Sequence, residues 1–424
     1  MPDTSLIVVD PGHFHAALVQ REMYATLSPR ARVYAPLGPE LLDYLGHIAR
    51  FNGRPQAPTC WQLDIDASPD FLARMRDEPP GGVAIFSGRN DGKIARIAAA
   101  LEAGLHVLAD KPIIIRRDDL PMLETALETA AARRLIFSDI MTGRCEVVSR
   151  VIRLLRADPE IFGEPLAGTR DEPGVALSGV HHLLKTVAGV VNQRPPWYFD
   201  VSVQGEGLAD TAVHHVDRAR ETLFPGEAID YRRDIEMLAA SRWPTPLSLA
   251  QFQRVTGEAG WPGYLGPWLD NGVLNYFCNG QVDYRVRGIH VRIEVRWDWE
   301  APHGDTHSAL YRGSRCRLEV RQGADQRFRP ELYVVPQAEI GMALERRVAA
   351  AQADFPGLEL DRLDGEWRVV IPDALRVGHE ANFAEFARAF LAFVENPATW
   401  PAREKANLLA KYFVCTEAVA LSQD

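Results

Sequence analysis

The sequence has few cysteines, and none of them is spaced for metal binding or for redox chemistry. The five are scattered over 424 residues, at Cys60, Cys145, Cys278, Cys316 and Cys415. No two form a Cys-x-x-Cys pair, and an odd, scattered set does not suggest a disulfide framework. We therefore expect reduced thiols in a cytoplasmic protein, and no cysteine-based zinc site.

Long hydrophobic runs and an excess of positive charge are also missing. No apolar stretch approaches the length of a membrane-spanning helix. The start, MPDTSLIVVDPGH, has no basic region, so we expect no signal peptide. Acidic residues outnumber basic ones by 57 to 47, which gives a net charge of −10. This balance argues against nucleic acid or an anionic membrane as the main partner.

A chain of this length is too long for one typical core, so we expect two domains, divided at residues 138 and 139. The first, residues 1–138, alternates short apolar runs with helical patterns. This alternation predicts a doubly wound parallel sheet. The expected strands are 5–9, 31–35, 82–86, 106–109 and 134–137, and the expected helices are 14–24, 40–51, 69–77, 93–103 and 118–133.

The first turn lacks most of the glycines that a dinucleotide-binding sheet normally has there. The expected pattern is G-x-G-x-x-G, but this chain has Asp10 and His15 at the outer positions and keeps only Gly12. His13 or His15 could donate to a phosphate, or both could be ordinary turn and helix-start residues. The second strand ends without an acid for a ribose hydroxyl, so the choice between NAD and NADP stays open.

A lysine follows the fourth expected strand, in the triplet Asp110-Lys111-Pro112. Proline cannot donate to a sheet ladder, so this triplet suits the carboxyl end of a buried strand. Open α/β sheets bind their ligands at that edge. Lys111 is therefore expected to reach into a cleft.

Two segments carry a family resemblance. The frame GGVAIFSGRNDGKIARIAAALEAGLHVLADKPIII resembles the part of Gfo/Idh/MocA-type oxidoreductases that ends in Glu-Lys-Pro, with Asp110 in place of Glu. About a hundred residues later, GEGLADTAVHHVD resembles the family's glycine-rich turn followed by Asp-x-x-x-His. The start DPGHFHAALVQ is similar to a bacterial subgroup that shares a particular carboxyl-terminal domain and in which the glycine pattern is usually broken.

The resemblance implies a Rossmann-like domain followed by an α+β domain with a large, mostly antiparallel open sheet. It implies NAD or NADP as the cofactor and a sugar or another polyol as the substrate. The cofactor-binding candidates lie in the first turn, in the loop after residue 86 and in the triplet after residue 109; they are Gly12, His13, Phe14, His15, Gly88, Arg89, Asn90, Asp110, Lys111 and Pro112.

Asp210 and His214 are expected to share one face of a helix, because they are four residues apart. A carboxylate beside an imidazole can fix its tautomer and raise its basicity, which suits a base that takes a hydroxyl proton. Together with the triplet, this spacing indicates a catalytic group of Lys111, Asp210 and His214. On its own, the spacing would favour an ordinary surface pair. His215 points about 100° away around the helix and should have other surroundings.

The second domain, residues 139–424, reads as an α+β substrate-binding and oligomerisation domain. We expect helices at 139–156, from 181 onward, at 381–394 and at 403–420, and an irregular lid or oligomer contact at 225–267. The Asn279-Gly280 pair predicts a hairpin turn. The expected strands are 199–204, 272–278, 281–287, 290–299, 310–312, 316–321, 332–335 and 367–371. In the family such a sheet commonly packs on another subunit, so we expect a homodimer or homotetramer.

Polar residues near strand ends are the candidates for the substrate side: Lys185, Tyr198, Asp305 and His307. Sugar hydroxyls need donors and acceptors together, although an ordinary polar turn would look the same. His181 and His182 have no metal-ligand spacing with other candidate ligands, so no metal is expected.

The sequence thus predicts an NAD(P)-dependent oxidoreductase that acts on a hydroxyl of a sugar or polyol. One alternative is a glycosidase that uses transient, NAD-dependent oxidation. Another is a protein that senses a sugar or nucleotide and binds without turnover. The Asp-x-x-x-His pattern weighs against a sensor, which needs no base.

Overall fold

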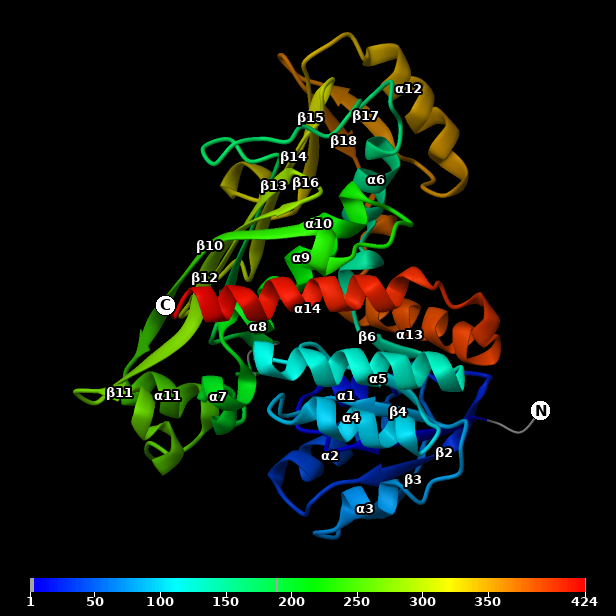
Figure 1. Ribbon diagram of the computed structural model, residues 1–424, viewed down its shortest axis with the longest axis vertical. Helices are drawn as coiled ribbons and strands as arrows, with labels where there is room; N and C mark the ends of the chain where they lie inside the picture. The colour runs from blue at the N-terminus through cyan, green and yellow to red at the C-terminus, as the bar shows by residue number, and fades with distance from the viewer. Residues whose placement is uncertain (1–3, 188–189, 192, 424) are drawn as a thin grey trace. The chain divides into compact units, whose positions relative to one another are not determined.

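The computed structural model describes residues 4–187, 190–191 and 193–423, which form two compact units. The first unit consists of Met1–Thr142, Ser202–Gly205 and His379–Tyr412. The second consists of Gly143–Val201, Glu206–Gly378 and Phe413–Asp424. Figure 1 labels the elements of both.

The first unit is built on a parallel six-stranded sheet with the strand order β3-β2-β1-β4-β5-β6. This order is that of doubly wound dinucleotide-binding folds, and it confirms the predicted fold class. Short, apolar, largely β-branched runs form the central strands, which suits strands covered on both faces. The strands are β1 Thr4–Val9, β2 Leu27–Tyr34, β3 Gln62–Asp66, β4 Val83–Phe86, β5 His106–Ala109 and β6 Phe137–Asp139.

Helices follow the strands of this sheet, as the alternating pattern predicted. Figure 1 shows α4 and α5 side by side, and residues of the two helices are in contact. Gly104 closes α4 in the left-handed region at φ 87°, where glycine carries no steric penalty. The helices are α1 His15–Leu18, α2 Pro39–Gly53, α3 Phe71–Met75, α4 Lys93–Glu102 and α5 Leu120–Arg133.

Two helical segments near the carboxyl end, which reach as far as Tyr412, complete the first unit. One face of α13 (His379–Glu395) packs into the core formed by β1, β2 and α2, with Phe383 and Phe390 almost fully buried. The following helix, α14 (Arg403–Leu421), is attached through Asp139 of β6. The Asp139 carboxylate accepts from Lys411 Nζ at 2.8 Å and from the Tyr412 hydroxyl at 2.7 Å. Removing one member of such a buried pair is strongly destabilising.

The second unit is organised around a ten-stranded sheet in which β10-β12-β13-β7-β14-β15-β16-β18-β17 form the path and β11 pairs with β12. Only the β7–β13 pairing in this sheet is parallel among the described residues, so the sheet is mixed but mostly antiparallel, as predicted. The strands are β7 Val175–His182, β10 Ile235–Leu247, β11 Leu269–Asp270, β12 Val273–Val286, β13 Ile289–Asp298, β14 Thr306–Arg312, β15 Cys316–Arg321, β16 Glu331–Pro336, β17 Glu359–Arg362 and β18 Trp367–Val370.

Short elements and helices connect these strands. The α-helices are α6 Val147–Arg156, α7 Val201–Gln204, α8 Gly207–Asp210, α9 Ala212–Leu223, α10 Tyr231–Asp234, α11 Leu249–Thr256 and α12 Gly341–Ala350. A separate small pair consists of β8 Thr186–Val187 and β9 Val190–Val191. None of the described helices of the chain is both long and apolar enough to cross a membrane.

Several predictions for the second half were wrong. The stretch from His181, predicted as helical, ends strand β7, because β13 and β14 pair with it on its two sides. The predicted strand at 199–204 is a 3-10 turn (Pro196–Phe199) followed by α7. The prolines at 195 and 196 explain this, since proline presets the backbone for a turn. The expected helix at 139–156 begins only at Val147.

The predicted Asn279-Gly280 turn lies inside β12, so that prediction was also wrong. The hairpin between β12 and β13 turns at Arg287 and Gly288, whose φ angles of 48° and 80° suit a tight two-residue turn. Gly280 is instead needed for close packing, because a Cβ there would lie 2.6 Å from the Leu208 side chain. The 225–267 stretch is not irregular; it contains the thirteen-residue strand β10 and α11.

Candidate functional site

The first unit gathers all of the predicted cofactor-binding residues on one edge of its sheet. Strands β1, β4 and β5 are neighbours and parallel, so their carboxyl ends meet. The residues directly after these three ends are 10–15, 87–90 and 110–112. Crevices outside the carboxyl ends of open parallel sheets are where such folds bind ligands.

The turn after β1 is closed by contacts within the chain. Asp10 has φ 47°, and its carboxylate faces Arg96 of α4 at 3.3 Å. The amides of Gly12 and His13 donate to the carbonyl of Ser87 at 2.9 and 3.1 Å. These are amides that a standard phosphate turn offers to a ligand. In this chain the Asp10 charge is compensated by an arginine, and the two amides bond to the residue after β4 instead.

Gly88 is required by this closure. A Cβ at this position would lie 2.4 Å from the Asp10 carbonyl oxygen and 3.0 Å from the Gly12 nitrogen. Such approaches to backbone atoms cannot be relieved by a side-chain rotation. Glycine at position 88 therefore has a role in packing, because the missing side chain lets the loop after β4 lie against the turn after β1.

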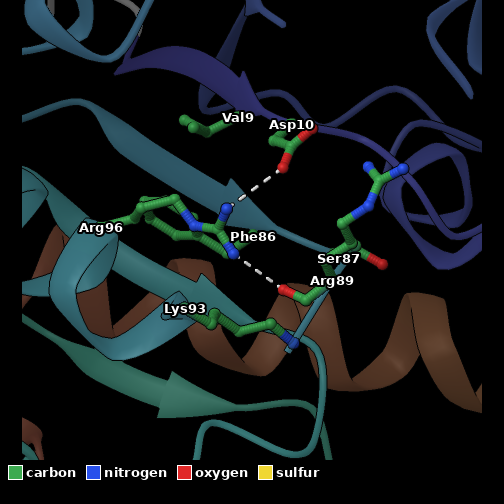
Figure 2. Close-up of a pocket in the computed structure, with 8 residues that line it drawn as sticks. Val9, Asp10, Phe86, Ser87, Arg89, Lys93 and Arg96 are labelled. Carbon is green, nitrogen blue, oxygen red and sulfur yellow. Dashed lines mark hydrogen bonds and ion pairs between the residues drawn. The ribbon is translucent and has the colours of Figure 1, made fainter. Parts of the chain in front are cut away.

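A small pocket with three cationic side chains lies beside this turn (Figure 2). Figure 2 shows Arg96 between the Asp10 carboxylate and the Arg89 carbonyl, to which it donates at 2.8 Å. Arg89 donates to Glu40 of α2 at 2.6 Å. The empty space at this pocket, which includes its opening to solvent, is about 170 Å³. Its lining residues are Val9, Asp10, Phe86, Ser87, Gly88, Arg89, Lys93 and Arg96.

Lys93 and Asn90 tie the loop after β4 to its surroundings. The almost fully buried Lys93 ammonium donates to the carbonyls of Asp110 and Pro112 at 3.0 Å each, and also to the Asn90 side chain. Asn90 donates through its amide nitrogen to the Gln204 carbonyl at 2.6 Å. Lys93 therefore holds the Asp110-Lys111-Pro112 triplet in place, and Asn90 holds the 202–205 segment.

The carboxylate of Asp110 is the hub of this edge. A single oxygen, Oδ2, accepts from His13 Nδ1 at 3.0 Å, from His15 Nδ1 at 3.1 Å and from the Ser87 hydroxyl at 3.1 Å. The structure thus brings together two residues of the turn and the acid of the triplet. Phe14 contacts the rings on both sides of it and is itself partly exposed.

The charges of this cluster follow from its surroundings. Burial alone would raise the pKa of Asp110, but the neighbouring imidazoles of His15 and His13 hold it well below its usual range. Burial, with the nearby His15, lowers the pKa of His13 to about 4, although its bond to Asp110 opposes this. At neutral pH the cluster therefore contains an ionised carboxylate next to a neutral imidazole.

Asp210 and His214 belong to the second unit, on two helices rather than one. The helix breaks at Thr211, whose hydroxyl accepts from the Trp297 indole at 3.0 Å. Asp210 ends α8 and is buried, whereas His214 lies in the first turn of α9 and is half-buried. Lys111 is in the first unit. His215 has different surroundings from His214, as predicted, since it packs over Gly179 of β7.

Buried aromatic residues lie near Asp210, among them Tyr198 and Tyr276. Burial raises the pKa of Tyr198, the Arg194 charge opposes this, and the Asp210 carboxylate adds to it. The Arg194 guanidinium lies 4.6 Å from the ring centre of Tyr198 and 5.2 Å from that of Trp297. Tyr198 is thus a buried tyrosine with a guanidinium over its ring and a carboxylate near enough to raise its pKa.

The other three substrate candidates gather around one carboxylate. Asp305 accepts from His181 Nδ1 at 3.0 Å and from Lys185 at 2.5 Å. Its second oxygen accepts from the His182 amide at 3.2 Å. Burial would raise the pKa of Asp305, but the His181 bond and the Lys185 charge lower it well below its usual range. His307 of β14 lies opposite Gly179 of β7, two residues before His181. The nearby His181 is one cause of the lowered pKa of His307.

Residues that were missed complete this group. His181 stacks on Trp297 with the ring centres 4.9 Å apart, and Arg194 covers the same indole. His215 Nδ1 has no hydrogen-bond partner among the described residues, and burial holds the pKa of His215 well below its usual range. Period-two alternation along 175–182 could have placed His181 on the same face as Gly179.

The neutral His307 should make the protein less stable in acid. Burial, the Arg218 charge and His181 lower its pKa from 6.5 to about 3. Between these pH values the unfolded chain binds a proton that the folded chain does not, so the free energy of unfolding falls as the pH falls. We expect H307Q to flatten this slope by up to about 1.4 kcal/mol per pH unit in urea unfolding. The exposed His303 gives the control H303Q; equal slopes in both variants would contradict the assignment.

The parallel sheet, with polar residues following the carboxyl ends of β1, β4 and β5, defines an α/β protein whose first unit has the dinucleotide-binding topology. Residues 151–423 match the family model described as "Putative oxidoreductase C terminal domain". The chain therefore belongs to this family of Gfo/Idh/MocA-type oxidoreductases. No curated protein matches it in sequence.

Solved structures agree with this assignment. The chain is similar to a "putative oxidoreductase" from Parabacteroides merdae ATCC 43184, at 38% identity over 99% of this chain and 98% of that chain, with a TM-score of 0.95. Two more distant structures share the fold. GenD2 from gentamicin A biosynthesis, in complex with NAD, is 13% identical over 100% and 95% of the two chains, with a TM-score of 0.59. A 3-ketoreductase from Actinomadura kijaniata, in complex with TDP-benzene and NADP, is 16% identical over 97% and 96%, with a TM-score of 0.55.

Proposed function

We propose that this oxidoreductase is NAD(P)-dependent and transfers hydride between the nicotinamide and a hydroxyl-bearing carbon of a sugar or polyol. The observation that carries the proposal is the edge where β1, β4 and β5 end, with Asp110-Lys111-Pro112 following β5. Family membership supports the redox chemistry. The NAD and NADP complexes among distant structures support the cofactor.

The donors at this edge fit a dinucleotide held mainly by side chains. Because the Gly12 and His13 amides bond to Ser87, a diphosphate would depend on guanidinium groups. Arg96 is the candidate that lines the pocket from α4, and Arg89 lines it from the loop after β4. The close approach at Gly88 holds the loop after β4 against the turn after β1. When bound, the nicotinamide would accept the hydride or return it.

We assign the acid–base work to Lys111, Asp210 and His214. An imidazole nitrogen of His214 would take the proton from the substrate hydroxyl, and Asp210 would orient that ring. The Lys111 ammonium, which follows β5 in the first unit, would stabilise negative charge that develops on a substrate oxygen. The burial of Asp210 beside Tyr198 supports a fixed carboxylate, since a buried charge is held by its neighbours.

The group around Asp305 is the proposed recognition site for the sugar. It offers an acceptor, Asp305, and donors from Lys185 and His181 within a few ångströms of one another. The Trp297 indole beside them adds an aromatic surface, and a site of few polar groups on such a surface is typical of small-ligand sites. His307 is a further candidate contact.

A release experiment tests the cofactor and the class of reaction together. One sample of the purified protein is denatured, and the small molecules that it releases are identified by mass spectrometry. A second, native sample is supplied with NAD⁺ or NADP⁺ and screened with sugars and glycosides for the absorbance of the reduced nicotinamide. We expect NAD or NADP and a rise in this absorbance with some sugar. Cleaved glycoside without net reduction would indicate the redox-assisted glycosidase instead. Binding without turnover would indicate a sensor.

Replacing Arg96 should weaken cofactor binding. Losing one charge-assisted contact costs about 1.5–3 kcal/mol, so R96Q should bind NAD(P) about 10- to 100-fold more weakly in a titration. The control is R74Q. Arg74 lies on α3, is about half exposed and forms an ion pair with Asp66 at the end of β3. Thermal melts check that R96Q is folded. Equal affinities of R96Q and R74Q would remove Arg96 from the cofactor site.

A further inference from the structure

We propose that His13, His15 and Asp110 form a binding site for a divalent transition-metal ion of the zinc class. This goes beyond the proposed redox function, for which no metal is needed, and it departs from the sequence-based expectation of no metal. The three side chains each offer one ligand atom, and these atoms all lie within 4.8 Å of one another. The site lies entirely within the first unit.

The ligand set has the chemistry of a metal centre. Two imidazole nitrogens and one carboxylate oxygen suit zinc and related first-row ions. Metal–ligand bonds of about 2.0–2.2 Å place neighbouring ligand atoms about 3.0–3.5 Å apart, the longer value in tetrahedral geometry. The separations from Asp110 Oδ2 to the two Nδ1 atoms are 3.0 and 3.1 Å. An ion could therefore replace the two hydrogen bonds with little movement of the side chains.

The three ligands are held by the sheet edge rather than by a mobile segment. His13 lies in the turn after β1, His15 begins α1, and Asp110 directly follows β5. The Asp110 side chain is 7% exposed, while those of His13 and His15 are 24% and 13% exposed. A buried carboxylate with two partly exposed imidazoles leaves a coordination position open to water or a ligand. Sites with three protein ligands and one open position are of the catalytic type.

An outer partner for one ligand is also present. His379 Nε2 lies 3.3 Å from His15 Nε2, on the side of the ring away from Asp110. Binding of an ion at Nδ1 would leave the His15 proton on Nε2, where His379 could accept it. Ligating histidines almost always donate their other N–H in this way. Ser87 would keep its bond to the Asp110 carboxylate.

The test uses the full-length protein, stripped with a chelator and freed of nucleotide. Zn²⁺ is added and followed by calorimetry and by metal analysis after gel filtration, and Co²⁺ is added to read the ligands from its visible absorption. We expect one ion per chain. D110N and H15Q should each weaken binding at least about 100-fold, and H379A about 10- to 100-fold. H47Q, which changes a histidine on α2 outside the cluster, should bind like the parent.

The outcomes separate this proposal from the others. Binding that is undiminished in both D110N and H15Q, or no binding in the parent protein, would show that the cluster is a hydrogen-bond network only. Circular dichroism identifies any variant that does not fold, and H15Q stands in if D110N fails. Because the readout is metal binding without nucleotide, failure here leaves the NAD(P) proposal standing, and failure of that proposal leaves this one standing.

Discussion

H214A should lose almost all turnover while still binding the nucleotide. If an imidazole nitrogen of His214 takes the hydroxyl proton, its loss should lower kcat by about 10²- to 10⁴-fold, as is typical of a general base. His214 is in the second unit, whereas the cofactor candidates are in the first, so NAD(P) affinity should change less than about 2-fold. Steady-state kinetics and a nucleotide titration measure the two effects.

The pH profile separates a base from a structural residue. D210N should also lower kcat and should shift the acidic limb of the profile, because Asp210 would act through the basicity of His214. H47A is the matched control, since His47 is a half-exposed histidine on α2 paired with Asp43. Loss of both turnover and nucleotide binding in H214A, or loss of neither, would overturn these roles.

G207A should destabilise the protein strongly, although it adds only one methyl group. Gly207 starts α8, and a Cβ there would lie 1.9 Å from the Cys278 carbonyl oxygen of β12. Both sides of this contact are backbone, so the helix carrying Asp210 or the strand must shift. We expect a loss of about 3 kcal/mol or more in the free energy of unfolding.

The control for this prediction is G266A. A Cβ at Gly266 meets nothing within 4 Å, so the change should stay within about 1 kcal/mol. Urea unfolding followed by fluorescence measures both variants. If G207A matches G266A, the helix does not depend on the close approach to β12. A stable G207A with reduced turnover would instead indicate that α8 moved and displaced Asp210.

The first unit could be predicted because its signals are local. Continuous apolar runs such as 5–9 and 82–86 suit central parallel strands covered on both faces. The strand that was missed, Gln62–Asp66, lies at the edge of the sheet and is half-exposed, so its sequence carries no apolar run. Edge strands are decided by their neighbour rather than by their own composition.

The hub at Asp110 could not be predicted in detail. The sequence placed His13, His15 and Asp110 near one sheet edge, but the residues that meet there are 95 and 97 positions apart. His15 stands where a glycine was expected, and this substitution already indicated that the turn differs from a standard phosphate-binding turn. The shared bond of both histidines to a single carboxylate oxygen follows from the packing of the turn after β1 against β4 and β5.

In the second unit, secondary structure was predicted wrongly where tertiary contacts outweigh the local preferences of the sequence. Asn279-Gly280 has strong turn chemistry, yet the long β12–β13 ladder and Leu208 keep it in a strand. His181 similarly lies in a strand because β13 and β14 flank it. Lys185 and Asp305 are nevertheless in contact, as their positions near strand ends suggested, and their role in binding substrate stays a prediction.

The most direct measurement is the transfer of a labelled hydride. Protein with bound NAD⁺ or NADP⁺ is incubated with sugars and polyols deuterated at their hydroxyl-bearing carbons, and the nicotinamide is analysed by mass spectrometry. The proposed function predicts deuterium on the nicotinamide with at least one sugar, and none with H214A. A protein that binds both nucleotide and sugar but never labels the nicotinamide would contradict it.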